Sequence, residues 1–130
     1  MRLLLDTHIF LWYITGDRRL SDAVLPLIRD PANAVYLSVV SVWEAMVKYQ
    51  LGRLPLPQPP DSYIPQQRQR HRIESLSLDE ESVTNLAKLP ELHKDPFDRM
   101  LICQAIQHGL TIVSVDDALG AYSTQVSVIR

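Results

Sequence analysis

Residues 1–10, MRLLLDTHIF, carry three consecutive leucines that run directly into Asp6. A short, continuously apolar run of this kind is typical of a strand that is buried on both faces of a parallel sheet. A carboxylate at the edge of a core is costly unless a hydrogen bond or an opposite charge compensates it. The stretch therefore predicts a buried strand over residues 3–5 and, at its carboxyl end, something that compensates the charge of Asp6.

The composition is that of an ordinary soluble globular protein. The chain has 130 residues, 46% of them hydrophobic and 22% charged, with a net charge of −2, which fits one domain over residues 1–130. No apolar run reaches the roughly 18 residues of a membrane span, and the leucine run is too short for a signal peptide. The single cysteine, Cys103, favours the cytoplasm. The slightly acidic balance predicts that any contact with nucleic acid is local.

Short apolar segments alternate with segments of helical pattern. The predicted helices include residues 21–29 with Ser21 as N-cap, residues 39–52 closing at Gly52, and residues 77–89 with a capping box of Ser77 and Glu80. Another begins with Pro96 and closes at Gly109. This alternation predicts an α/β fold, a three-layer sandwich in which a parallel sheet of 4–5 strands has helices on both faces. We expect the strands at residues 3–5, 34–38, 73–76, 111–115 and 126–129.

Two acids, Asp6 and Asp116, directly follow predicted strands. In a parallel α/β sheet, ligands bind beyond the carboxyl ends of the strands, which makes both residues candidates for a functional site. Each could equally be the N-cap of the helix that follows it. Taken alone, neither residue decides between these interpretations.

Glu44 lies in the predicted helix after the second strand, on a narrow polar stripe with Ser41 and Lys48. Ser41 and Glu44 fit a capping box, whereas Glu44 and Lys48 fit an exposed i,i+4 ion pair worth a few tenths of a kcal/mol. In the functional interpretation the stripe faces a cleft above the strands. The three interpretations stay open at this point.

Asp98 is harder to explain as a surface charge. At helical spacing it shares a face with Leu101, Ile102 and Ala105, and that face should be buried. A first-turn acid gains about 0.3–1 kcal/mol from the helix dipole, less than its burial costs without a cation. Asp95 precedes Pro96 and fits an N-cap, so it is a weaker candidate.

The four carboxylates come from distant parts of the chain and can meet at one edge of the sheet. Two charges about 4 Å apart repel by about 4 kcal/mol at an effective dielectric constant near 20, and the sequence offers no matching set of buried lysines. A hard divalent cation such as Mg²⁺ or Mn²⁺ would compensate them. The lack of a cysteine or a clear histidine ligand argues against zinc; His93 is only a weak candidate for a supporting role.

The segments LLLDTH, SVVSVWEAMVK, HKDPFDRMLICQA and IVSVDDAL occur in this order. The chain thereby resembles, almost from end to end, a PIN-domain ribonuclease of the VapC type, the toxin of bacterial toxin–antitoxin pairs. By motif position, Asp6, Glu44 and Asp98 match the core acids of that family, and Asp116 matches its fourth acid. Leu119 stands where the family often has an aromatic residue.

The resemblance implies a Mg²⁺-dependent endoribonuclease, with Mn²⁺ able to substitute, that cleaves structured RNA such as tRNA or rRNA. It also implies a VapB-like antitoxin partner and a homodimer. Asp6, Glu44, Asp98 and Asp116 would be the catalytic metal ligands, with one or two ions activating a water molecule. Residues that could support the site are Thr7, Asp95 and Asp117.

Other classes of protein also place an acid after the first strand. A haloacid-dehalogenase-like phosphatase needs a second aspartate two residues later, where this chain has His8. A receiver-like signalling module would bind Mg²⁺ but would leave Glu44 without a role. A catalytically inactive Mg²⁺-binding interaction module is a further alternative, and the intact set of acids argues against it.

Overall fold

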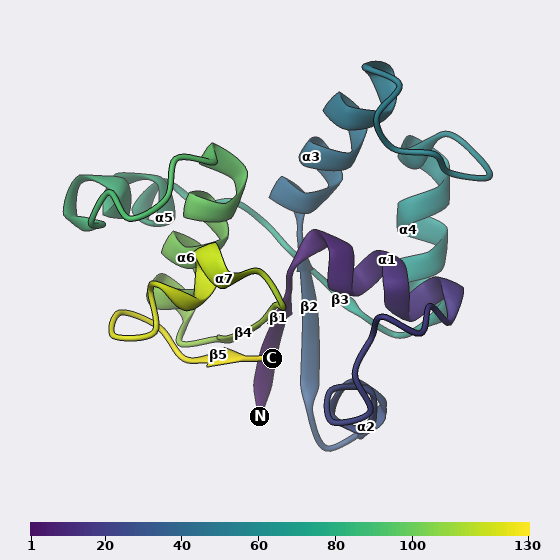
Figure 1. Ribbon diagram of the computed structural model, residues 1–130, viewed down its shortest axis with the longest axis horizontal. Coiled ribbons are helices and arrows are strands. Elements are labelled where there is room, and N and C mark those ends of the chain that lie inside the picture. Colours follow the sequence, from purple (N-terminus) through teal and green to yellow (C-terminus); the bar gives the residue numbers. More distant parts are fainter.

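Five parallel strands form the centre of the fold in the computed structural model, which describes residues 1–130 (Figure 1). The strand order is β3-β2-β1-β4-β5, and every neighbouring pair is parallel. The first strand therefore lies in the middle of the sheet. The strands are β1 (Arg2–Leu5), β2 (Ala34–Ser38), β3 (Glu74–Leu76), β4 (Thr111–Val113) and β5 (Val128–Ile129).

Strand β1 supplies side chains to two separate cores. Leu3 and Leu5 pack in a cluster on one face of the sheet, and Leu4 packs in a second cluster on the other face; all three side chains are fully buried. Successive side chains of a strand point to opposite faces, so a strand with apolar residues at every position needs cover on both sides. The predicted three-layer α/β architecture is confirmed.

The helices cover the sheet in two groups (Figure 1). Residues of the first four helices pack in the cluster with Leu3 and Leu5, whereas α6, α7 and Val40 at the start of α3 pack in the cluster with Leu4. The helices are α1 (Thr7–Thr15), α2 (Leu25–Arg29), α3 (Val39–Gln50), α4 (Pro60–Arg70), α5 (Glu80–Thr84), α6 (Pro96–His108) and α7 (Asp117–Gly120), with a short 3-10 helix η1 (Asn85–Lys88). None of them is long and apolar enough to cross a bilayer.

The ends of α6 follow the sequence signals. Pro96 occupies the first helical position, Asp95 is the N-cap, and Gly109 closes the helix with a left-handed φ of 64°. Only glycine adopts that conformation without a steric penalty. These end signals fix the position of Asp98 in the first turn of α6.

Two predicted helix starts are wrong. Ser77 and Glu80 form no capping box, because Asp79 is the N-cap of α5 and accepts a hydrogen bond from the Ser82 N–H at 2.8 Å. Helix α2 begins at Leu25 rather than near Ser21, whose hydroxyl accepts from the Val24 N–H at 3.3 Å in the preceding turn. In both cases a nearby residue can form a competing turn or cap, and sequence spacing alone does not show which of the two forms.

Candidate metal centre

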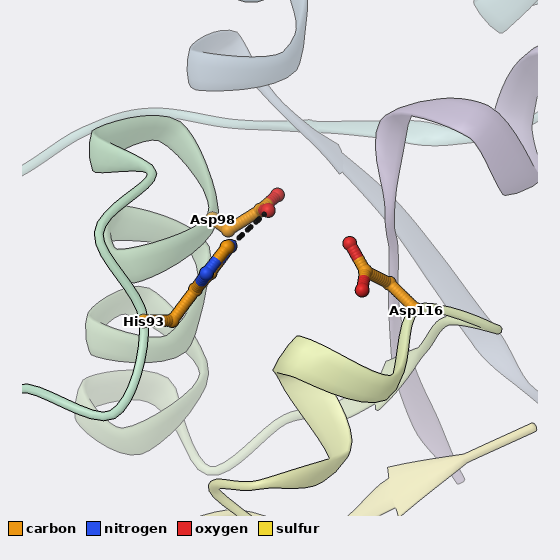
Figure 2. A group of neighbouring side chains, drawn as sticks. All are labelled: His93, Asp98 and Asp116. Atoms are coloured by element: carbon orange, nitrogen blue, oxygen red, sulfur yellow. Dashed lines mark hydrogen bonds and ion pairs between the residues drawn. The ribbon is translucent and has the colours of Figure 1, made fainter.

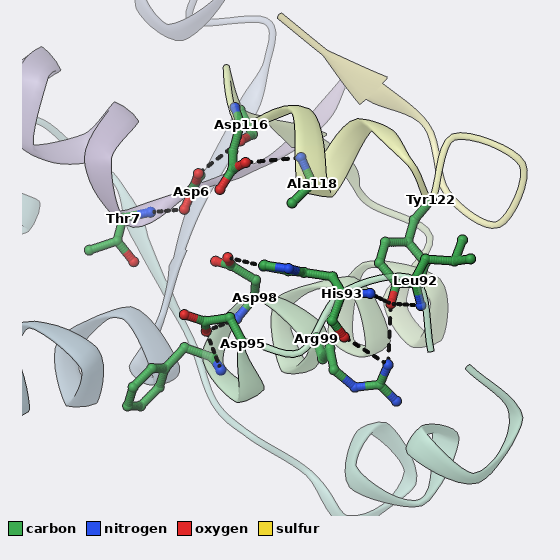
Figure 3. A network of polar contacts seen from close by, with 12 residues as sticks. Asp6, Thr7, Leu92, His93, Asp95, Asp98, Arg99, Asp116, Ala118 and Tyr122 are labelled. Carbon is green, nitrogen blue, oxygen red and sulfur yellow. Dashed lines mark hydrogen bonds and ion pairs between the residues drawn. The ribbon is translucent and has the colours of Figure 1, made fainter. Parts of the chain in front are cut away.

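The acid cluster consists of Asp6, Glu44, Asp98 and Asp116, at the carboxyl edge of the sheet. Figure 3 shows Asp6, Asp98 and Asp116 facing one another, and the charges of Asp6 and Glu44 act on Asp98. Asp6 follows β1, Asp116 lies three residues after β4, and Glu44 and Asp98 project from α3 and α6. The carboxyl ends of parallel strands share one edge, and the elements that follow them begin there. The topology therefore brings together the residues that are remote in the sequence.

Asp6 is buried, with 6% of its surface exposed, and both of its oxygens are hydrogen-bonded. Oδ1 accepts from the Thr7 N–H at 2.7 Å, and Oδ2 accepts from the Ser114 hydroxyl at 2.8 Å. Burial raises the pKa of Asp6, and the charge of Glu44 adds to that effect, although the hydrogen bonds and nearby His8 oppose it. Asp6 is both the N-cap of α1 and a member of the acid cluster.

Glu44 is buried, with 3% of its surface exposed, so the expectation of an exposed ion pair is wrong. Its Oε1 accepts from the Thr7 hydroxyl at 2.7 Å, and Thr7 Oγ1 lies 2.9 Å from Ser41 Oγ. Its Oε2 forms an ion pair with Lys48. Ser41 forms no capping box with Glu44, because Ser38 is the N-cap of α3. The charge of Glu44 acts on Asp6 and Asp98, so this end of the polar stripe of α3 lies beside the other acids.

Lys48 is the one lysine that compensates part of the negative charge. Burial lowers its pKa, but the hydrogen bond and charge of Glu44, with the charges of Asp95 and Asp98, outweigh burial, and the pKa is raised overall. The side chain of Lys48 stays about one-third exposed. One cation against several acids leaves the cluster with excess negative charge.

Asp98 is buried on the face of α6 that the sequence predicts, with 9% of its surface exposed. Its Oδ2 lies 2.8 Å from His93 Nε2. Burial raises its pKa to about 6, helped by the charges of Asp6, Asp95 and Glu44 and opposed by the hydrogen bond with His93. Asp95 is an N-cap, as predicted, because its Oδ1 accepts from the Phe97 and Asp98 N–H groups.

Asp116 combines the two interpretations given to it from the sequence. It is the N-cap of α7, accepting from the Ala118 N–H at 2.9 Å, and its own N–H donates to the Ser114 hydroxyl at 3.0 Å. Its carboxylate also faces His93 and Asp98, and ligand atoms of these three residues lie within 4.8 Å of one another (Figure 2). Asp117 instead forms an exposed ion pair with Arg130, outside this group.

The donor set fits a hard divalent cation. The acids are gathered with Lys48 as the cation paired against their charge, and the raised pKa values of Asp6 and Asp98 express the cost of that arrangement. Carboxylate oxygens are the ligands that Mg²⁺ and Mn²⁺ prefer. A bound cation would reverse the electrostatic penalty on both aspartates.

Sequence reasoning underrated two residues of this site. Ser114 bridges Asp6 and Asp116 from a fully buried position, and its signal in the sequence is the Ser-Val-Asp spacing that it forms with Asp116. His93 contacts Asp98 directly, although it lies five residues earlier in a loop. The signal for His93 in the sequence is its position just before the DPFD segment. Because His93 lies outside a helix, its spacing from Asp98 does not predict that the two side chains are in contact.

The sequence and the fold of this chain are both similar to those of known proteins. A family model described as "PIN domain" matches residues 3–124. "Ribonuclease VapC16" of Mycobacterium tuberculosis (strain ATCC 25618 / H37Rv) is 40% identical to this chain over 53 residues, which are 41% of this chain and 38% of that relative. The matched segment thus spans well under half the length of the curated relative.

Solved structures share the fold over nearly the whole chain. A chain of VapBC2 from Rickettsia felis, bound to a promoter DNA fragment, superposes with a TM-score of 0.71 at 16% identity, covering 99% of this chain and 98% of that one. A chain of DNA-bound VapBC from Salmonella typhimurium gives a TM-score of 0.69 at 14% identity, covering 99% and 97%. At these identities the likeness concerns the fold.

Proposed function

Because this chain belongs to the PIN domain family, we propose that it is a metal-dependent endoribonuclease and the toxin of a type II toxin–antitoxin pair. The observation that carries the proposal is the convergence of buried Asp6, Glu44 and Asp98, from three remote segments, at one edge of the sheet. The name of the partly matching relative, a ribonuclease VapC, supports the same activity. We propose the cytoplasm as its location.

The proposed cofactor is Mg²⁺, for which Mn²⁺ can substitute, held by Asp6, Glu44, Asp98 and Asp116. Such an ion supplies Lewis-acid activation of water and stabilises charge on the phosphodiester oxygens. The Thr7 hydroxyl orients Glu44, and the Ser114 hydroxyl orients Asp6. Lys48 pairs with Glu44 and compensates part of the negative charge of the acids. These hydrogen bonds fix the carboxylates before substrate arrives.

The proposed substrate is RNA, and its proposed class is tRNA or rRNA. Cationic side chains at the rim of the acid cluster are the proposed contacts for its phosphate groups. Lys94 and Arg99 line a polar hollow of about 270 Å³ together with His93. Hydrolysis by an activated water needs no side-chain nucleophile, in agreement with Ser41 and Ser114 being engaged with Thr7 and Asp6.

The proposed protein partner is a VapB-like antitoxin, and a homodimer is the proposed assembly. A groove of about 430 Å³ along α1 and the loop before α4 suits an amphipathic helix or an extended segment. The names of the VapBC structures support a partner of this kind. Apolar and aromatic residues that line the groove are Leu11, Trp12, Leu54, Leu56 and Tyr63.

The test is cleavage of total RNA by the purified protein in Mg²⁺, with and without EDTA, repeated with Asp6→Asn. We expect cleavage that EDTA abolishes and that the variant lowers at least about 100-fold, because one ligand of the centre is lost. Asp22→Asn, at an exposed acid in the turn before α2, is the matched control and should cleave normally. Cleavage that survives both EDTA and Asp6→Asn would reject the proposal.

Expression in bacteria gives an independent readout. We expect the wild-type chain to arrest growth, and Glu44→Gln or Asp98→Asn to relieve the arrest. An inactive interaction module or a receiver-like module would cleave no RNA. Equal toxicity of the wild type and both variants would mean that growth arrest does not depend on the acid cluster.

A further inference from the structure

The loop before α6 is held by a buried hydroxyl group (Figure 3). Tyr122 is fully buried, and its hydroxyl lies 3.1 Å from both the Leu92 and His93 N–H groups and donates to the Pro90 carbonyl at 2.8 Å. Arg99 Nη1 lies 3.1 Å from the same carbonyl, 3.3 Å from the His93 carbonyl and 3.2 Å from the Tyr122 hydroxyl. The backbone on both sides of the His93 side chain is therefore fixed from the core.

This clamp aims the His93 ring at the acids. Nε2 lies 2.8 Å from Asp98 Oδ2, and the Asp116 carboxylate completes a group whose ligand atoms lie within 4.8 Å of one another (Figure 2). Two neighbouring ligands of an octahedral ion with bonds of about 2.1 Å are about 3.0 Å apart. His93 Nε2 and Asp98 Oδ2 stand near that spacing, and the Asp116 carboxylate lies within 4.8 Å of both.

We propose that His93 is itself a ligand of the metal centre, so that this chain binds its cation through one imidazole nitrogen as well as carboxylates. The proposal rests on the metal-dependent function proposed above and deepens it. Imidazole suits transition-metal ions, whereas Mg²⁺ binds oxygen almost exclusively. The site should therefore favour Co²⁺ and Mn²⁺ over Mg²⁺ more strongly than a site of oxygen ligands alone.

Ligation by His93 sets a requirement on the protonation of its imidazole ring. Ligation requires that Nε2 carry no proton, so that the remaining proton of a neutral imidazole resides on Nδ1. A polar hollow lined by Glu91, Lys94 and Arg99 adjoins His93, so water can solvate the other side of the ring. Tyr122 and Arg99 act as positioning residues, because they contact the backbone of the loop and not Nε2 of His93.

The test measures metal binding without RNA. Calorimetric titration with Co²⁺ and with Mg²⁺ is made on the wild type, on His93→Gln, and on the matched control His71→Gln, whose ring packs against Tyr13 away from the acids. We expect His93→Gln to weaken Co²⁺ binding at least about tenfold and Mg²⁺ binding less than about threefold. Electron spin-echo spectroscopy of bound Mn²⁺ should detect a ¹⁴N coupling in the wild type and in His71→Gln that is lost in His93→Gln.

Tyr122→Phe gives a second variant, since it keeps the buried ring and removes only the hydroxyl. We expect Co²⁺ affinity to fall several-fold and Mg²⁺ affinity to hold. Equal losses of affinity for both ions in His93→Gln, or no ¹⁴N coupling in the wild type, would overturn the proposal that His93 is a ligand. Cleavage of RNA by the wild type in Mg²⁺ would then still support the proposed metal-dependent function. Binding of neither ion to the wild type would overturn it together with the proposed metal-dependent function.

Discussion

Replacing Asp98 with asparagine should make the metal-free protein more stable. The pKa of Asp98 rises from 3.8 to about 6 in the folded protein, and each pKa unit corresponds to about 1.36 kcal/mol. The penalty on the ionised carboxylate is therefore at most about 3 kcal/mol. Residual solvent at the side chain, 12% exposed, and the lost attraction of a first-turn acid to the helix dipole reduce the expected gain to about 1–2 kcal/mol.

Urea denaturation in EDTA at pH 7.5 measures this gain. The asparagine side chain of the variant keeps an oxygen that can accept from His93, so packing should change little. The penalty begins as pH rises above 3.8 and is complete above about pH 6; the gain should therefore vanish in the same measurement at pH 3.5. Asp22→Asn, at an exposed acid, should change the free energy of unfolding by less than about 0.5 kcal/mol. An Asp98→Asn variant that is less stable at pH 7.5 would refute the reasoning.

Three further predictions concern pH, the core and a helix end. Because metal binding needs the ionised carboxylate, and the pKa of Asp98 is about 6, Mg²⁺ affinity measured by calorimetry should fall at least about tenfold between pH 7.5 and pH 5; a flat profile would contradict this. Leu101→Ala should lower the free energy of unfolding by about 2–5 kcal/mol in urea, since Leu101 is fully buried, and a loss below about 1 kcal/mol would count against the core described. Gly109→Ala should cost about 1–2 kcal/mol, because φ is 64° at that helix end, and no change in thermal midpoint would argue against this helix end.

The strands and the core were predictable because their signals are local. The apolar run before Asp6 is typical of a strand buried on both faces, and β1 is the central strand of the sheet with both faces covered. Pro96 and Gly109 likewise fix the ends of α6 through backbone conformation alone. Where two polar residues compete for one helix start, as Ser77 and Asp79 do, the outcome depends on tertiary packing that the sequence does not display.

The acid cluster was predictable in outline and not in its contacts. The spacing of Asp98 against Leu101 and Ala105 predicts burial, which the structure bears out. No periodicity links His93 to Asp98 or Tyr122 to the loop before α6, because these contacts depend on an irregular segment docked by long-range hydrogen bonds. The roles of the acids as metal ligands remain a prediction.

Diffraction from crystals soaked in Mn²⁺ tests the central claim most directly, because anomalous scattering locates the ion without reference to activity. The account predicts a strong peak among the carboxylates of Asp6, Glu44, Asp98 and Asp116, absent from crystals of Asp98→Asn. Crystals saturated with Mn²⁺ that show no peak among these residues, or the same peak in the variant, would contradict it.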